Sequence, residues 1–315
     1  MLNSRHSPVG SRARAQESHR ESMRELRRHG LFRKACAAVC LLAAAALASA
    51  AGPSPTLARI KADATIRLGY RSGAAPFSFK ERDGRVRGYS AELCTHIVAA
   101  LQKQLALPAL KVEWVPLDAD TRLDAVASGR ADIECCTTTI SLSRYEKVDF
   151  SLPIFIDGGS LMVQESAKIE RFADLDGRTI AVIAGTTTER GLERQLAVMG
   201  TKARMVTVKD GAEGVRLLTS GKVDAYASDR IVLIGLRSTA SEPEKLRLLD
   251  SDFSFEPYAL VVRRDDPDFR LAVNRALVEI YRGGEIDPIF HRWLGGLGEP
   301  SPLLNAMFYL STLPQ

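Results

Sequence analysis

The chain has 315 residues, a length that suits two domains better than one, and 45% of them are hydrophobic, enough to form packed cores. Charged residues make up 26%, and this composition excludes a disordered protein. The net charge of +5 comes from residues 1–50, which hold nine Lys/Arg and three Glu and leave 34 basic and 35 acidic residues elsewhere, a net charge of −1. The rest of the chain therefore has no excess positive charge for a nucleic-acid partner.

The first fifty residues have the pattern of an export signal. Arg33 and Lys34 precede an apolar run, Ala35–Ala48, and Ala48-Ser49-Ala50 fits the small-residue site at which such signals are cleaved. The run is shorter than the roughly 20 apolar residues of a membrane-spanning helix. We therefore expect residues 1–50 to be a cleavable signal peptide and the remainder to be a periplasmic protein.

Beyond the leader, strand and helix patterns alternate. Up to residue 134 the sequence predicts helices over Thr56–Ala64, Ala91–Leu105 and Arg122–Ser128, and strands over Thr65–Tyr70, Val112–Val115 and Ala131–Glu134. The turn Asp83-Gly84 predicts a hairpin between Phe77–Phe79 and Gly88–Ser90. Such alternation is typical of an α/β sheet with ligand sites at its strand ends.

The same pattern then starts again. The sequence predicts strands over Gly158–Val163, Thr179–Ile183, Ala203–Val208, Ala225–Ala227 and Phe255–Arg263. It predicts helical segments over Phe172–Leu175, Glu189–Met199, Gly211–Thr219, Pro267–Arg282 and Glu285–Leu294, followed by a Gly/Pro-rich tail.

Two extended stretches, around Asp149–Ile156 and Ser251–Val261, separate the blocks. If the chain crosses between domains at both, two strands connect two lobes over a deep cleft. The expected division is then one lobe of residues 51–154 and 251–300, a second lobe of residues 155–250, and a C-terminal tail of residues 301–315.

Short motifs along the chain resemble, in order, those of the amino-acid-binding proteins of ABC importers, solute-binding protein family 3. The motifs are Gly69–Arg71, Pro76–Phe79, Gly88–Ser90, Asp132–Thr139, Arg144 with Asp149–Ser151, Phe172–Gly177, Ala184–Thr187 and Ser220–Ala225. The resemblance is strongest to the type that binds glutamate and aspartate, and it covers essentially all of the chain after the leader. It implies a type II periplasmic-binding-protein fold, with two α/β lobes joined by two hinge strands. It also implies a monomer that binds a free amino acid and has permease subunits as partners.

The resemblance assigns roles to five residues in the cleft. It implies that Arg144 binds the α-carboxylate of the ligand, that Thr137, Thr139 and Thr187 share this carboxylate or the ammonium, and that Asp229 faces the ammonium. These residue types suit the task, because a zwitterion leaves water only when each of its charges finds a partner. A guanidinium matches the two oxygens of a carboxylate and never loses its proton. The glycine loop at Gly185, before a helix, is also expected to point N–H groups at an anion.

Ligand choice depends on two more arginines. Arg71 and Arg122 match positions at which acidic-amino-acid binders meet the second carboxylate, and without such a ligand the cleft would hold excess positive charge. Gly211 and Ala119 depart from the resemblance, because related proteins have histidine and serine there. A related dicarboxylate, glutamine or another polar amino acid therefore stays open as the ligand.

The sequence leaves two other classes of function as alternatives, an enzyme and a sensor. Some dehydratases share this fold, but after the leader only His96 and His291 remain as histidines, and the sequence has no nucleophile triad, metal cluster or phosphate loop. We therefore expect no catalytic residue, metal or cofactor. A sensor that presents the same lobes to a receptor is the other alternative, and the chain contains no signalling domain that would support it.

Several buried residues have more than one interpretation. We expect Glu134 to stabilise its lobe rather than contact the ligand, whereas Tyr258 suits either the cleft or the core. Cys94, Cys135 and Cys136 suit buried free thiols, or one bridge between Cys94 and a member of the pair.

Overall fold

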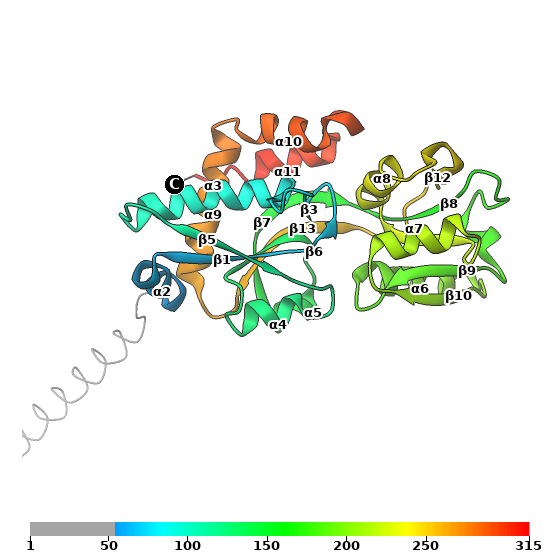
Figure 1. Ribbon diagram of the computed structural model, residues 1–315, viewed down its shortest axis with the longest axis horizontal. Helices are drawn as coiled ribbons and strands as arrows, with labels where there is room; N and C mark the ends of the chain where they lie inside the picture. Colours follow the sequence, from blue (N-terminus) through cyan, green and yellow to red (C-terminus); the bar gives the residue numbers. More distant parts are fainter. Residues whose placement is uncertain (1–53, 315) are drawn as a thin grey trace, which may run out of the picture. The chain divides into compact units, whose positions relative to one another are not determined.

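The computed structural model describes residues 54–314, and two five-stranded sheets organise them (Figure 1). The predicted signal peptide, residues 1–50, lies outside the described residues. Within residues 54–314, no helix combines the length and the apolar character that crossing a membrane requires.

The helices and strands follow one another as the sequence patterns predict for most of the chain. The α-helices are α2 (Pro55–Asp63), α3 (Tyr89–Gln104), α4 (Arg122–Ala127), α5 (Leu142–Tyr145), α6 (Thr187–Met199), α7 (Gly211–Thr219), α8 (Arg230–Ser238), α9 (Pro267–Arg282), α10 (Ile286–Leu294) and α11 (Pro302–Leu310). The strands are β1 (Thr65–Tyr70), β2 (Gly73–Ala74), β3 (Ser78–Lys80), β4 (Val86–Arg87), β5 (Lys111–Pro116), β6 (Ile133–Thr139), β7 (Val148–Asp157), β8 (Gly159–Gln164), β9 (Thr179–Ile183), β10 (Arg204–Val208), β11 (Ala225–Asp229), β12 (Leu246–Leu248) and β13 (Glu256–Arg263).

The two sheets have matching topologies. The first sheet has the order β5-β1-β6-β13-β7, in which β1 pairs in parallel with β5 and β6, and β13 is antiparallel to β6 and β7. The second sheet has the order β10-β9-β11-β8-β12, in which β9 pairs in parallel with β10 and β11, and β8 is antiparallel to β11 and β12. Each sheet thus places the ends of three parallel strands along one edge, which is where α/β sheets bind ligands.

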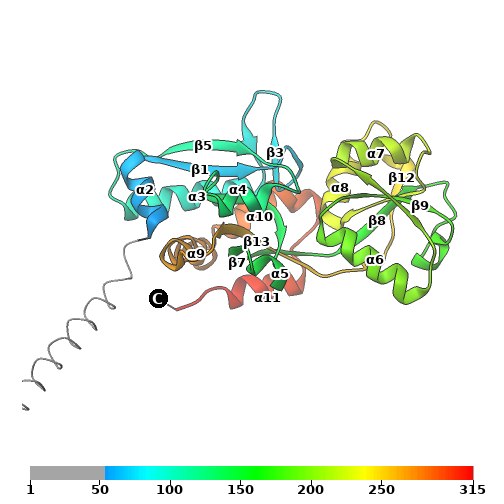
Figure 2. The same cartoon turned by 90° about the horizontal axis from the view of Figure 1, so that it is seen from below.

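Helices cover both faces of each sheet. In the first, α3 and α9 pack together over β6 and β7, whereas α4 and α5 pack on the opposite side of β7 and β13. In the second, α7 and α8 lie on one face and α6 on the other (Figure 2). Two buried clusters flank each sheet, which is the layered α/β arrangement that the alternating pattern predicts.

The chain passes between the sheets at two places that lie against each other. The first crossing follows the end of β7 at Gly158 and Gly159, and the second precedes β13 at Asp252–Ser254. A Cβ atom on Gly158 would lie 2.6 Å from Asp252 Oδ2, and one on Gly159 would lie 2.6 Å from Ser254 Oγ. The crossings can approach this closely only because both residues lack side chains. β7 of the first sheet reaches three residues beyond residue 154, the proposed boundary between the lobes, and β8 of the second sheet begins at Gly159.

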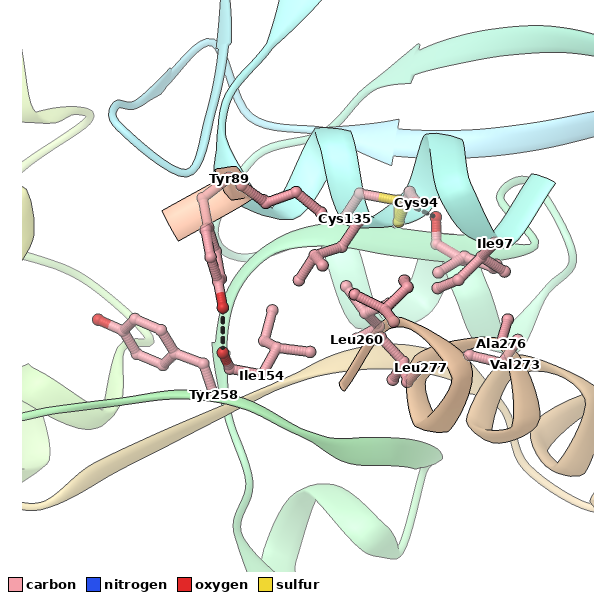
Figure 3. Packing of buried hydrophobic residues seen from close by; sticks show 14 of the residues in the cluster. Tyr89, Cys94, Ile97, Cys135, Ile154, Tyr258, Leu260, Val273, Ala276 and Leu277 are labelled. Atoms are coloured by element: carbon pink, nitrogen blue, oxygen red, sulfur yellow. Dashed lines mark hydrogen bonds between the residues drawn. A yellow bond between two sulfur atoms is a disulfide. The ribbon is translucent and has the colours of Figure 1, made fainter. Parts of the chain in front are cut away.

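The first lobe contains a disulfide bond. Cys94 of α3 is bonded to Cys135 of β6 (Figure 3). Cys136 is a buried free thiol. The same close-up shows the Tyr89 hydroxyl donating to the carbonyl oxygen of Ile154, at 2.8 Å. The bridge therefore fastens a covering helix to the central strand of its sheet.

Three predictions from the sequence are wrong in detail. The second hairpin strand is Val86–Arg87 rather than Gly88–Ser90, because Tyr89 and Ser90 are fully buried in the first turn of α3. The residues from Arg230 to Ser238 form α8, which was not predicted. The predicted tail contains α11, which begins with a Ser301 N-cap and buries Leu304, Met307 and Phe308 against the core. It is therefore part of the first lobe.

Candidate ligand-binding site

One pocket collects residues from the strand ends of both sheets, and we call it the interlobe pocket. Its lining includes six of the seven predicted site residues: Arg71, Arg122, Thr137, Arg144, Thr187 and Asp229. The first four come from elements of the first sheet and its helices, and the last two from the second. The topology explains the collection, because each residue follows or ends a strand of a parallel pair or begins the helix after it.

Arg144 is held in place by the backbone of a neighbouring strand. It lies in α5, its side chain is buried, and its Nη1 donates to the carbonyl oxygen of Thr139 at 2.7 Å. Burial lowers the pKa of Arg144, and the nearby charge of Arg190 lowers it further, while Glu134, Glu256 and Asp229 oppose the shift. An arginine keeps its proton despite such shifts, so a buried cation borders the pocket.

Arg122 is the second buried cation. It begins α4, where its Nε donates to the hydroxyl of Thr138 at 2.9 Å and lies 3.9 Å from Glu134 Oε1. Burial lowers the pKa of Arg122 to about 10, and the charge of Arg144 adds to this effect against the opposing charge of Glu134. Glu134 itself is fully buried and does not border the pocket, so its expected structural role is supported.

Arg71 adds a third positive charge at the end of β1. Within the described residues its guanidinium has no carboxylate within salt-bridge distance, while its backbone N–H donates to Ser78 Oγ at 3.3 Å. Arg71, Arg122 and Arg144 all line the interlobe pocket, where Asp229 is the lining carboxylate. Among the lining residues, three guanidinium groups therefore face one carboxylate.

Asp229 ends β11 and is held by two hydroxyl groups. Thr188 donates to its Oδ1 at 2.6 Å, and Tyr258 donates to its Oδ2. The Tyr258 hydroxyl also lies 3.1 Å from Asp157 Oδ2. Burial raises the pKa of both Asp157 and Asp229, and the charge of Asp229 adds to the effect on Asp157. Tyr258 is fully buried, so it packs in the core and orients Asp229 from behind.

A buried glutamate at the start of β13 engages two of the predicted threonines. The hydroxyls of Thr139 and Thr187 each lie 2.6 Å from Glu256 Oε2, and Ser254 donates to Oε1 at the same distance. Thr139 does not line the pocket, and its predicted ligand contact stays a prediction. Thr187 belongs to the second lobe, so this glutamate links the two lobes beside the pocket.

In the loop before α6, the backbone amide of Gly185 is not free to bind an anion as predicted. The Gly185 N–H donates to Glu189 Oε2 at 2.7 Å, and Thr186 caps the helix by accepting from the N–H of Glu189 at 3.0 Å. The amide of Gly185 is therefore occupied from within its own loop. Thr188 and Tyr226 also line the pocket and were not predicted from the sequence. The only sequence signal for them is that they lie close to predicted residues.

Within residues 54–314, no group of three or more His, Cys, Asp or Glu side chains is arranged to hold a metal ion. Guanidinium groups on one side and a carboxylate on the other can hold the two charges of a zwitterion.

Two lobes of this topology, joined by two crossings over a charged pocket, define a solute-binding protein with the type II periplasmic-binding-protein fold. The chain belongs to the bacterial extracellular solute-binding proteins, family 3, whose family model matches residues 66–296.

Relatives within this family have similar lengths. An "L-glutamate/L-aspartate-binding protein" of Pseudomonas aeruginosa is 36% identical over 239 residues, which cover 76% of this chain and 79% of the relative. A "Glutamate/aspartate import solute-binding protein" of Escherichia coli K12 is 30% identical over 285 residues, or 89% of this chain and 94% of the relative.

Among solved structures, an ancestral amino-acid-binding protein described as a precursor of cyclohexadienyl dehydratase has a TM-score of 0.66 and 29% identity. The similarity covers 76% of this chain and 98% of that one. The fold predicted from the sequence is confirmed.

Proposed function

We propose that this protein is the periplasmic binding component of an amino-acid ABC importer and that it closes its cleft on a free acidic amino acid, glutamate or aspartate. The observation that carries the proposal is the charge of the interlobe pocket, with three arginines and one aspartate supplied by two lobes. The names of the relatives from Pseudomonas aeruginosa and Escherichia coli support the same ligand class.

Each charge of such a ligand would have a partner. Arg144 would bind the α-carboxylate with the N–H groups that Thr139 leaves free, and Thr137 and Thr187 would add hydroxyl groups. Asp229 would accept from the ammonium, since Thr188 and Tyr258 use only part of its acceptor capacity. Arg71 and Arg122 would meet the distal carboxylate. A ligand with two carboxylates and one ammonium would thus reduce the excess positive charge of the pocket.

We infer binding without catalysis. Neither of the histidines in the described residues, His96 and His291, lines the interlobe pocket, so no imidazole is in reach to move a proton at the ligand. Transfer of a bound solute to permease subunits is the expected next step, and the protein would do this as a monomer.

Export to the periplasm fits the chemistry of the first lobe. The Cys94–Cys135 disulfide belongs to an oxidising compartment, and the apolar run before Ala50 supports a cleaved signal peptide. We therefore propose that the mature protein begins near Ala51.

A thermal-shift panel tests the proposal. The purified protein is melted alone and with glutamate, aspartate, glutamine, lysine or histidine. A ligand at about 100 times its dissociation constant stabilises the folded state by about 2.7 kcal/mol, which corresponds to a rise in Tm of roughly 5–10 °C for a chain of this size. Glutamate and aspartate should give the largest rise. A largest rise with lysine, or no rise with any of the five, would contradict the proposal.

A further inference from the structure

A tyrosine hydroxyl is buried in the second lobe without a partner. Tyr226 is fully buried, and its hydroxyl oxygen has no hydrogen-bonding partner within the part of the chain that the structure describes. Two other buried tyrosines do have a partner. The Tyr89 hydroxyl donates to the carbonyl oxygen of Ile154, and the Tyr281 hydroxyl donates to that of Pro153. A buried hydroxyl without a hydrogen bond destabilises a fold. A bound ligand that accepts this hydrogen bond would remove that cost.

The ring of Tyr226 passes beneath α7 toward the interlobe pocket. It lies in the middle of β11, and a Cβ atom on Gly214 of α7 would lie 2.4 Å from its Cε2 atom. Glycine at residue 214 therefore leaves the space that the ring occupies. The residue lines the interlobe pocket together with Arg71, Ser228 and Asp229.

The hydroxyl is a neutral donor in this setting. Burial raises the pKa of Tyr226, while the nearby Ser228 side chain, which does not meet hydrogen-bonding geometry, and the positive charge of Arg71 lower it only in part. A neutral phenol donates one proton, and a carboxylate is the strongest acceptor that an amino-acid ligand could offer it.

Gly211 at the start of α7 offers no side chain to the carboxylate of a ligand. A Cβ atom on Gly211, which also lines the pocket, would lie 2.7 Å from Leu236 Cδ1, so the position is closed to a side chain unless Leu236 moves. β11, which carries Tyr226, packs directly beneath α7 and lies beside the same part of the pocket.

We propose that the Tyr226 hydroxyl donates a hydrogen bond to the distal carboxylate of the bound amino acid, beside Arg71, and that it determines specificity from the second lobe. The inference rests on the proposed function, since it names a further contact of the same ligand. The hydroxyl would be unpaired in the ligand-free protein and paired on binding, which links recognition of the side chain to the lobe that carries Asp229.

Calorimetric titration of Tyr226→Phe with glutamate and with norvaline tests the inference. Norvaline has a side chain of the same length without the carboxylate. The substitution should weaken glutamate binding about tenfold, the usual scale for a hydrogen bond to a charged group, and leave norvaline binding unchanged. The ratio of the two affinities does not depend on how much of the protein is folded, so the test holds even if the variant folds poorly.

The matched control is Tyr89→Phe, which removes a hydroxyl that has a partner and does not line the pocket. Tyr89→Phe should lower Tm and leave both affinities unchanged, whereas Tyr226→Phe should not lower Tm, because it removes no hydrogen bond of the ligand-free protein. A glutamate-to-norvaline ratio in Tyr226→Phe within about twofold of that of the unaltered protein would overturn the inference. If the unaltered protein bound neither glutamate nor aspartate, the proposed function itself would fail; if it bound glutamate, the ratio would test the inference alone.

Discussion

Three guanidinium groups line the interlobe pocket, and we propose that their charge selects the kind of ligand that the protein takes. Arg122 and Arg144 are almost completely buried. The charge of Arg144 lowers the pKa of Arg122, and the charge of Arg190 lowers the pKa of Arg144. Keeping these charges close together costs free energy that an anionic ligand would return on binding. Under the proposed function, the strength of binding and the choice of ligand would depend on the same residues.

Replacement of Arg122 should change both ligand choice and stability, because it leaves the fully buried Glu134 without its cation. We expect Arg122→Ala to lower the ratio of glutamate to glutamine affinity about tenfold, because a charged partner of the distal carboxylate is lost while the amide of glutamine loses less. Titration calorimetry with both ligands measures the ratio, and Arg216→Ala serves as the control because that arginine is exposed and pairs within α7. An unchanged ratio in Arg122→Ala would place the distal group elsewhere.

Asp229 should make binding depend on pH. Burial raises its pKa above the ordinary value of 3.8, and the charge of Glu256 adds to this effect. The ligand ammonium stabilises the ionised form of Asp229, so affinity should be greatest at neutral pH and fall as pH decreases through the raised pKa. Titrations from about pH 7 to about pH 4 should show this decline for the unaltered protein. In Asp229→Asn binding should be weaker and the decline smaller, and an equally steep decline there would assign the titration to another group.

At the scale of single elements, the disulfide is the covalent link between a helix and a strand. Cys94 of α3 and Cys135 of β6 are 41 residues apart in sequence, and closing a loop of that length stabilises a fold by about 4 kcal/mol in the chain-entropy view.

Loss of this link should lower thermal stability. The double variant Cys94→Ala/Cys135→Ala should melt roughly 10 °C lower than the unaltered protein and should not respond to reductant. Cys136→Ala keeps the bridge, so its Tm should still fall on reduction. If reductant left the Tm of the unaltered protein unchanged, the bridge would not contribute to stability.

Local pattern predicted the elements well wherever one face is apolar and the ends are marked. The Thr65–Tyr70 strand and the Pro267–Arg282 helix are found at their predicted bounds, the latter with Asp266 as its N-cap. The helix α8 was missed because Ile231–Ile234 is an apolar run with three β-branched residues, and it packs against both lobes. In α11 the Ser301-Pro302 start was a usable signal, but the glycines before it favoured a tail.

The site was predictable in part for the same reason. The motifs placed Arg144 and Asp229 in one pocket, because strand ends of parallel sheets meet along an edge. The orientation of Tyr226 was not predictable, because strand alternation puts its side chain on the opposite face of β11 from Asp229. Only the space beside Gly214 lets that ring reach the pocket.

At the scale of the whole molecule, the two lobes contribute unlike charges to the same pocket. Arg71, Arg122 and Arg144 come from the first lobe, and Asp229 comes from the second. A zwitterion held between them connects the lobes, so binding favours the closed arrangement over any in which the lobes are apart. The crossings at Gly158 and Gly159 lie beside this pocket and would serve as the hinge.

Titration of Arg144→Ala with glutamate tests this account most directly, because Arg144 is the partner proposed for the carboxylate that every amino acid carries. The account predicts saturable binding of glutamate to the unaltered protein and to the exposed-site control Arg292→Ala, and no measurable heat of binding to Arg144→Ala, whose melting curve must still show a folded protein. Near-normal glutamate affinity in folded Arg144→Ala would contradict the account.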